Sequence, residues 1–108
     1  MPGTAGKAAG RRIGVVGIVI SRREDSAARV QEVLGEFADL IVGRMGIPYR
    51  ERGVSVIAII VDGDTDRLGA MTGRLGAYPG VTVKSALTAF QGDESASTAD
   101  KESQREEE

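Results

Sequence analysis

Apolar residues along the chain gather into runs that have the length and the period of β-strands. The run from Ile13 to Ile20, IGVVGIVI, is rich in the β-branched residues that favour strands. The run from Val54 to Asp62, VSVIAIIVD, has the same character. Successive side chains of a strand point to opposite faces, so both runs carry apolar side chains on two faces. We therefore expect two strands that are covered on both sides.

Two other runs predict strands of a different kind. Leu40 to Val42 opens a second strand, and the stretch GRMGIPYRERG follows it. The run from Val81 to Leu87, VTVKSAL, alternates apolar residues with Thr82 and Lys84. A lysine on one face of an alternating strand is typical of a sheet edge, so we expect this last strand to be an edge strand.

A helical period follows the first strand. Ser21 and Glu24 have the spacing of a capping box, which predicts a helix that starts at Ser21. Apolar residues then recur at i, i+3, i+4 and i+7, the spacing of one helical stripe. The members of this stripe are Val30, Val33, Leu34 and Phe37.

A second helix is expected after Gly63, with Asp64 or Thr65 as its N-cap and Leu68, Met71 and Leu75 as its apolar stripe. Glycines inside a helix cost about 1 kcal/mol each relative to alanine. Gly69 and Gly73 lie inside this one, so we expect close packing of the helix backbone on the sheet to offset them. Pro79-Gly80 ends the helix.

The order β-α-β-β-α-β predicts an α+β protein with a ferredoxin-like βαββαβ sandwich. In that fold a four-stranded antiparallel sheet carries two helices on one face, with the first and third strands at the centre. The other sheet face would still expose apolar side chains from both central strands. We expect a second subunit, in a dimer or a tetramer, or a partner protein to cover this open sheet face.

Length and charge divide the chain into three parts. The 108 residues suit one domain. We expect a flexible arm at 1–10, the folded domain at 11–90 and a disordered acidic tail at 91–108, which has seven acids, two bases and hence a net charge of −5. Residues 11–90 carry eleven bases and nine acids, a net charge of +2.

Composition argues against several functions. The chain has no cysteine and no histidine, which removes thiolate chemistry, the commonest metal ligand and the usual general base. We therefore expect no catalytic residues, no metal and no cofactor. A near-neutral body with few aromatic residues gives no sign of nucleic-acid binding. No apolar run is long enough for a membrane span and no signal peptide is visible, so we expect a cytoplasmic protein without membrane contact.

The acidic stretch DGDTD, which contains Asp62, Asp64 and Asp66, resembles the start of a calcium loop. The last ligand of such a loop would be residue 73, which is glycine. Helix capping explains these acids better.

Two segments are candidate binding sites. In GRMGIPYRERG three arginines could converge on an anion or a partner, although an elongated hairpin explains the segment equally well. In Ser21-Arg22-Arg23, backbone N–H groups at a helix N-terminus and two arginines could bind an anion, although a plain helix cap is the simpler reading. The candidate ligand- or partner-binding residues are Ser21, Arg22, Arg23, Gly43, Arg44, Gly46, Tyr49, Arg50 and Arg52.

The stretches RIGVVGIVISRRE, GRMGIPYRERGVSVIAIIVDGDTD and LGAMTGRLGAYPGVTVKSA together resemble the family of iron-only hydrogenase system regulators, over about residues 12–87. The block GRMGIPYRERGVSV is the most specific part. The resemblance implies an ACT-like version of the ferredoxin-like fold, sheet-to-sheet pairing, and a small-molecule effector bound near the first strand–helix turn. That turn contains Ser21 and Arg22. The related nickel-responsive repressor uses His and Cys ligands, which this chain lacks, so nickel sensing does not carry over.

Three functional hypotheses follow. The leading one is a non-enzymatic regulatory module of the iron-only hydrogenase system that acts by binding a small ligand or a protein at an oligomer interface. The second is an assembly factor that docks on a hydrogenase-related protein and binds no metabolite. The third is an enzyme that uses Asp or Glu with Arg.

Overall fold

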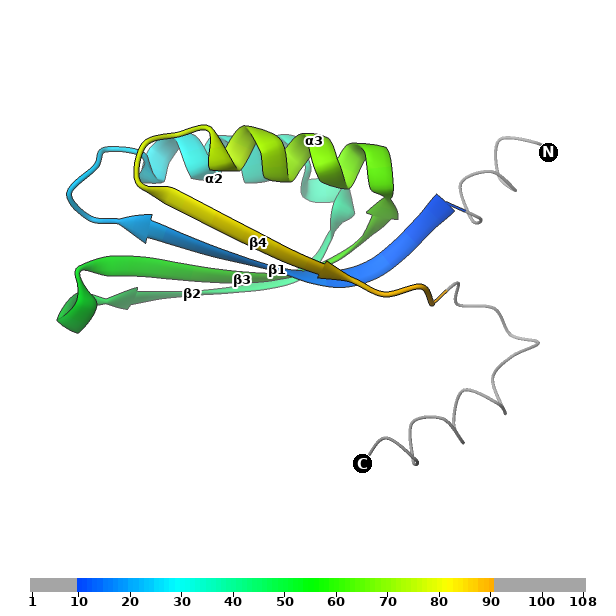
Figure 1. Cartoon of the computed structure of the whole chain (residues 1–108), viewed down its shortest axis with the longest axis horizontal. Coiled ribbons are helices and arrows are strands. Elements are labelled where there is room, and N and C mark those ends of the chain that lie inside the picture. Colours follow the sequence, from blue (N-terminus) through cyan, green and yellow to red (C-terminus); the bar gives the residue numbers. More distant parts are fainter. Residues whose placement is uncertain (1–9, 91–108) are drawn as a thin grey trace, which may run out of the picture.

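The structure, a computed structural model, describes residues 10–90 and forms a two-layer α+β sandwich (Figure 1). The predicted arm at 1–10, apart from Gly10, and the predicted tail at 91–108 lie outside the described residues. The elements are β1 (Arg11–Ser21), α2 (Ala27–Glu36), a 3₁₀ turn (Ala38–Leu40), β2 (Ile41–Tyr49), a second 3₁₀ turn (Arg50–Arg52), β3 (Val54–Asp64), α3 (Thr65–Gly76) and β4 (Val81–Leu87).

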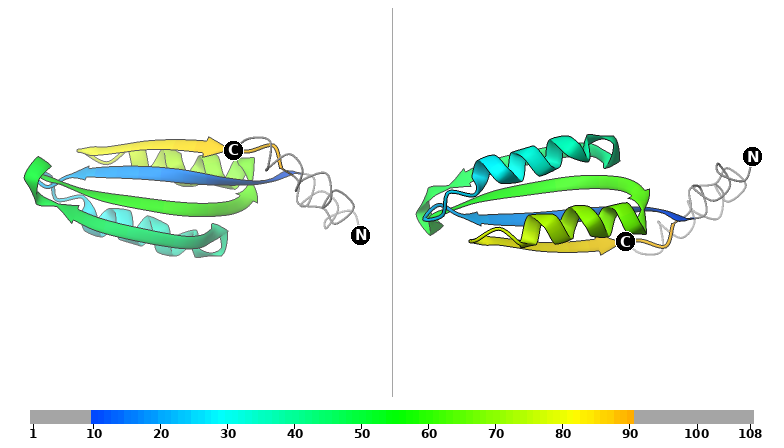
Figure 2. Two further views of the ribbon diagram at one scale, coloured as in Figure 1. Left: turned by 90° about the horizontal axis from the view of Figure 1, so that it is seen from below. Right: turned by 90° about the horizontal axis from the view of Figure 1, so that it is seen from above.

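The four strands form one antiparallel sheet in the order β2-β3-β1-β4. The first and third strands are therefore central, and β2 and β4 lie at the edges, as the ferredoxin-like fold requires. Both helices cover the same sheet face, and the other face carries no layer of its own within residues 10–90 (Figure 2). The predicted fold class and the edge position of β4 are confirmed.

The core lies between the helices and the sheet. Every second residue is buried there from Val16 to Ile20 in β1 and from Ile57 to Val61 in β3. The apolar stripe of α3 is buried as predicted, and so is that of α2 except for Phe37, which lies just beyond the helix and is only partly buried. The buried apolar residues are Val16, Ile18, Ile20, Val30, Val33, Leu34, Leu40, Ile57, Ile59, Val61, Leu68, Met71, Leu75 and Val81.

The start of the first helix was predicted wrongly. The helix begins at Ala27, and Ser21 is the last residue of β1. The Ser21 N–H donates to the Gly80 carbonyl oxygen at 2.8 Å, so a contact distant in sequence keeps Ser21 extended. The N-cap is Ser26, whose hydroxyl donates to the Pro79 carbonyl oxygen at 2.7 Å instead of capping the helix. The α3–β4 connection thus fixes both ends of the β1–α2 loop.

The second helix starts as predicted, because the Asp64 carboxylate accepts a hydrogen bond from the Arg67 N–H at 2.8 Å. Its glycines, however, do not pack closely on the sheet. A Cβ added at Gly69 or Gly73 would meet nothing within 4 Å outside the helix's own backbone. These glycines therefore lower the stability of the helix relative to alanine, and no close contact with the sheet offsets this loss.

The stretch GRMGIPYRERG forms an elongated hairpin with β3, and most of it is strand. Strand β2 continues to Tyr49 with one irregularity in register between Ile41 and Gly43, and only Arg50–Gly53 turns the chain into β3. Neither described helix, within residues 10–90, has the length and apolar character needed to span a bilayer.

Candidate functional site

The two predicted binding segments meet at one end of the sheet. The Arg22 N–H donates to the Gly53 carbonyl oxygen at 2.9 Å, which joins the β1–α2 loop to the β2–β3 turn. Both lie at the same end of the molecule in every view (Figures 1 and 2). Between them is a hollow of about 620 Å³, which we call the arginine hollow. It is lined by Ser21, Arg22, Arg23, Arg50, Glu51, Arg52, Gly53 and Val54.

Local backbone geometry holds the two loops in place. Gly53 has a φ of 67°, a left-handed conformation that favours glycine, and its N–H donates to the Arg50 carbonyl oxygen at 3.0 Å. On the opposite side, the Arg23 N–H donates to the Ser21 hydroxyl at 3.2 Å. Each loop is thereby closed by its own short-range hydrogen bond, and the Arg22–Gly53 bond fixes their relative position.

The helix-terminus explanation for Ser21–Arg23 is wrong. These residues precede α2 by a full loop, and the N–H groups of Ser21, Arg22 and Arg23 already donate to oxygens of the protein. The groups of the β1–α2 loop that remain available to bind an anion are the guanidinium groups of Arg22 and Arg23. Any anion held here would be bound by side chains.

The arginine hollow has a large uncompensated charge. Its lining includes four arginines and one glutamate, a net charge of +3. None of the four arginines forms an ion pair with a described residue. All four side chains are exposed, so a ligand can reach them from solvent. Electrostatically, this end of the sheet suits an anion.

The opposite end of the sheet provides a contrast. A hollow of about 410 Å³ there is lined by two arginines and three aspartates, a net charge of −1. Arg11 pairs with Asp62 at 2.7 Å, and Arg67 pairs with Asp39. Among residues 10–90, no group of three or more acidic side chains is placed to hold a metal ion.

The remaining predicted site residues do not join the arginine hollow. Arg44 lies on the helix side of β2 and donates to the Gln31 side-chain oxygen on α2 at 2.7 Å. It is about 20 Å of extended strand away from Arg50. Gly43 and Gly46 also lie within β2, where Gly46 is opposite Ile57. The predicted convergence of the three arginines is therefore wrong for Arg44 and holds for Arg50 and Arg52.

Tyr49 links the arginine hollow to the open sheet face. It is 42% exposed, pairs with Val54 and directly precedes Arg50. The open face is apolar over the middle of β1, β2 and β3. The Arg11–Asp62 ion pair lies at one end of it, and Thr82 and Lys84 lie along β4. The exposed large apolar residues on this face are Ile13, Val15, Val19, Met45, Ile47, Tyr49 and Ile60.

A cluster between the helices is structural in character. Arg67 and Arg74 both lie over the Phe37 ring, 5.5 and 5.8 Å from its centroid. Arg74 also pairs with Glu36, and hydrogen bonding followed by charge attraction lowers the pKa of the Glu36 carboxyl group. The hydrogen bond from Arg67 lowers the pKa of Asp39 in the same way. Since every charge here has a partner, the cluster fastens α2 and its 3₁₀ turn to α3.

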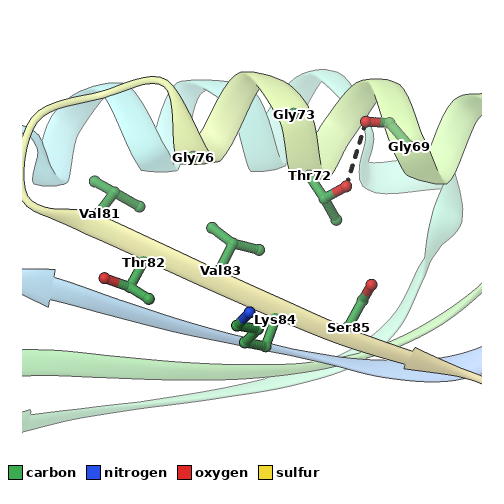
Figure 3. A pocket seen from close by; sticks show the side chains of 9 residues that line it. All are labelled: Gly69, Thr72, Gly73, Gly76, Val81, Thr82, Val83, Lys84 and Ser85. Carbon is green, nitrogen blue, oxygen red and sulfur yellow. Dashed lines mark hydrogen bonds between the residues drawn. The ribbon is translucent and has the colours of Figure 1, made fainter.

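Sequence reasoning missed a groove between α3 and β4. Gly69, Gly73 and Gly76 lie above the strand, and Val81, Val83 and Ser85 point up toward them (Figure 3). The groove has a volume of about 460 Å³. The spacing of the glycines, i, i+4 and i+7, places them on one helix face and was the available signal.

The chain is similar to a known family and to a solved structure. A family model described as "TM1266-like: Iron-only hydrogenase system regulator, putative" matches residues 12–85. A solved structure titled as that of the uncharacterized protein TM1266 from Thermotoga maritima is 35% identical, with a TM-score of 0.69, and the alignment covers 71% of this chain and 96% of that one. No curated protein matches the chain. The chain therefore belongs to the TM1266-like family of iron-only hydrogenase system regulators.

Proposed function

We propose that the protein is a non-enzymatic regulatory module that forms a homo-oligomer through its open sheet face and binds a small effector or a partner protein at the arginine hollow. The observation that carries this proposal is the continuity of the two surfaces. Tyr49 ends the apolar face, and Arg50 begins the lining of the hollow. A subunit that covers the face therefore ends beside the charged site.

The open sheet face supports the oligomer. Val15 and Ile60 are directly paired at its centre and are 53% and 49% exposed, while Met45 on the neighbouring edge strand is 64% exposed. Monomeric proteins rarely expose continuous apolar patches larger than a few hundred Å². Burial of apolar surface contributes roughly 25 cal/mol per Å², so a second copy of this chain laid on the face would be stabilising. A dimer or a tetramer satisfies this argument.

The regulatory role is supported by what the described side chains do. Asp64 caps a helix, and Asp62, Asp39 and Glu36 form ion pairs, so these carboxylates have structural partners. The hollow is lined by four arginines and a single carboxylate, Glu51, and this excess of guanidinium groups suits the binding of an anion. The description of the family as an iron-only hydrogenase system regulator supports the components of that system as candidate partners. An ACT-like arrangement, with an effector beside the first strand–helix loop, agrees with the position of the hollow.

The test measures assembly and ligand binding on the intact chain. Sedimentation velocity should find a dimer or a tetramer that persists on dilution. A thermal-shift screen of small metabolites should find at least one that raises the melting temperature. A stable monomer would contradict the oligomeric module. If no metabolite raises the melting temperature and a hydrogenase-related protein co-purifies, the assembly-factor hypothesis would be favoured instead.

A further inference from the structure

We infer that the arginine hollow binds a small molecule carrying two or more linked phosphate groups, such as a diphosphate. This inference deepens the proposed function, because it assigns a ligand class to the same site. It depends on four guanidinium groups that come from two loops distant in sequence and meet at one end of the sheet.

The charge balance of the hollow is the first argument. The lining of the hollow contains four positively charged side chains and only one negatively charged side chain, that of Glu51. The four are Arg22, Arg23, Arg50 and Arg52. Like charges held near one another repel, and that repulsion lowers stability unless a counter-charge is present. Of the six other arginines of the described residues, Arg11, Arg67 and Arg74 each pair with a carboxylate, while Arg12, Arg29 and Arg44 form no ion pair and do not line the hollow. The hollow differs in that four arginines line one site. The missing counter-charge at the hollow is the one that a bound anion would supply.

The rigidity of the frame is the second argument. The Arg22–Gly53 hydrogen bond at 2.9 Å and the Ser21–Gly80 bond at 2.8 Å attach the β1–α2 loop to two other connections. The arginines therefore extend from a fixed backbone, and binding has to order only side chains. A fixed frame lowers the entropic cost of binding. At about 620 Å³ the hollow also has the size of an ordinary small-molecule site.

The chemistry of guanidinium selects the ligand class. Its planar fork forms paired hydrogen bonds to phosphate and carboxylate oxygens. A lone carboxylate brings one negative charge and can occupy one or two forks. A phosphate group brings about −1.5 to −2 near neutral pH, so two linked phosphates balance a charge of +3 in a small volume. The number of arginines therefore favours a diphosphate over a simple carboxylic acid.

The probe is sodium pyrophosphate, titrated calorimetrically into the full-length protein at low salt and at 0.15 M salt, roughly the physiological ionic strength. We expect saturable binding at least tenfold tighter than that of inorganic phosphate or citrate, and weaker binding at the higher salt. Since the arginines are exposed, the variant Arg22→Ala/Arg50→Ala should fold normally and lose at least tenfold in affinity. Arg22→Lys/Arg50→Lys, which keeps the charge but removes the forks, should lose part of it.

The matched control is Arg29→Ala/Arg44→Ala, which also removes two exposed arginines, both outside the hollow, and should bind pyrophosphate like the unaltered protein. Equal losses in this control and in Arg22→Ala/Arg50→Ala would overturn the inference, because binding would then follow net charge alone. Absence of pyrophosphate binding at low salt would also overturn it. Tighter binding of a triglutamate peptide than of pyrophosphate would identify an acidic protein surface as the occupant and reject the diphosphate.

Sedimentation of the same samples separates this inference from the proposed function. If the unaltered protein is a monomer and still binds pyrophosphate at the hollow, the oligomeric module fails and the ligand assignment stands. If the protein is an oligomer and pyrophosphate does not bind, the ligand assignment fails and the oligomeric module stands.

Discussion

Gly80 is the residue on which the loop end of the sheet depends most. Its φ is 75°, and its carbonyl oxygen accepts the hydrogen bond that keeps Ser21 in β1. A Cβ at this position would lie 2.5 Å from Cγ of Glu24 and 3.1 Å from Cβ of Ser21. The residue therefore requires both the left-handed conformation and the absence of a side chain.

We expect Gly80→Ala to lower the free energy of unfolding by about 2 kcal/mol or more, because the left-handed conformation alone costs about 1–2 kcal/mol and the crowding adds to it. The control is Gly53→Ala. Gly53 has a similar φ of 67°, but open space surrounds its Cβ position, so only the conformational cost applies. Urea unfolding of both variants measures the difference. Equal losses would mean that Glu24 moves aside without cost.

At the scale of the element, no close contact within residues 10–90 explains why α3 has glycine at positions 69 and 73. Gly69 and Gly73 face the open groove above β4, where a methyl group meets no neighbour outside the helix's own backbone (Figure 3). The cost of glycine in a helix is an entropy cost of the backbone, and alanine removes it. The groove is therefore maintained at the expense of helix stability.

We expect Gly69→Ala and Gly73→Ala each to raise the free energy of unfolding by about 0.5–1 kcal/mol. Ala70→Gly, the reverse change at an exposed position of the same helix, should lower it by a similar amount. Denaturant titrations of the three variants provide the measurement. A loss of stability in the alanine variants would show that another part of the assembled protein fills the groove.

At the scale of the whole molecule, the two faces of the sheet differ completely. One face is covered by two helices and buries residues such as Ile18, while the other leaves Val15 and Ile60 half exposed. The charges differ along the sheet as well, since they are paired at one end and unpaired at the arginine hollow. An assembly through the apolar face would leave this charge pattern along its rim.

We expect Val15→Glu/Ile60→Glu to convert the oligomer to a monomer, because two adjacent carboxylates at the centre of an interface would lose their hydration and repel each other. Leu87→Glu is the matched control. Leu87 is 40% exposed but lies opposite Gly14, on the helix side of the sheet. Light scattering coupled to gel filtration gives the mass of each variant. An unchanged mass of the double variant would place the interface on another surface.

The sequence by itself determined the layers, because they follow from local periods. Apolar residues on both faces of Ile13–Ile20 and Val54–Asp62 placed these strands at the centre, and the stripe through Leu68, Met71 and Leu75 gave α3 its buried face. The Asp64 cap was also predictable, since it involves residues three apart. The two halves of the arginine hollow were each recognisable from their local charge.

The tertiary structure alone decided where α2 begins, which arginines meet, and what surrounds the glycines of α3. Ser21 ends a strand because the carbonyl of Gly80, 59 residues later, holds its N–H group, and a capping-box spacing contains no information about that contact. Arg50 and Arg52 join Arg22 while Arg44 does not, because sheet pairing turns β2 into β3 next to the end of β1. Local sequence sets which elements form. Contacts between distant segments set which of their side chains become neighbours.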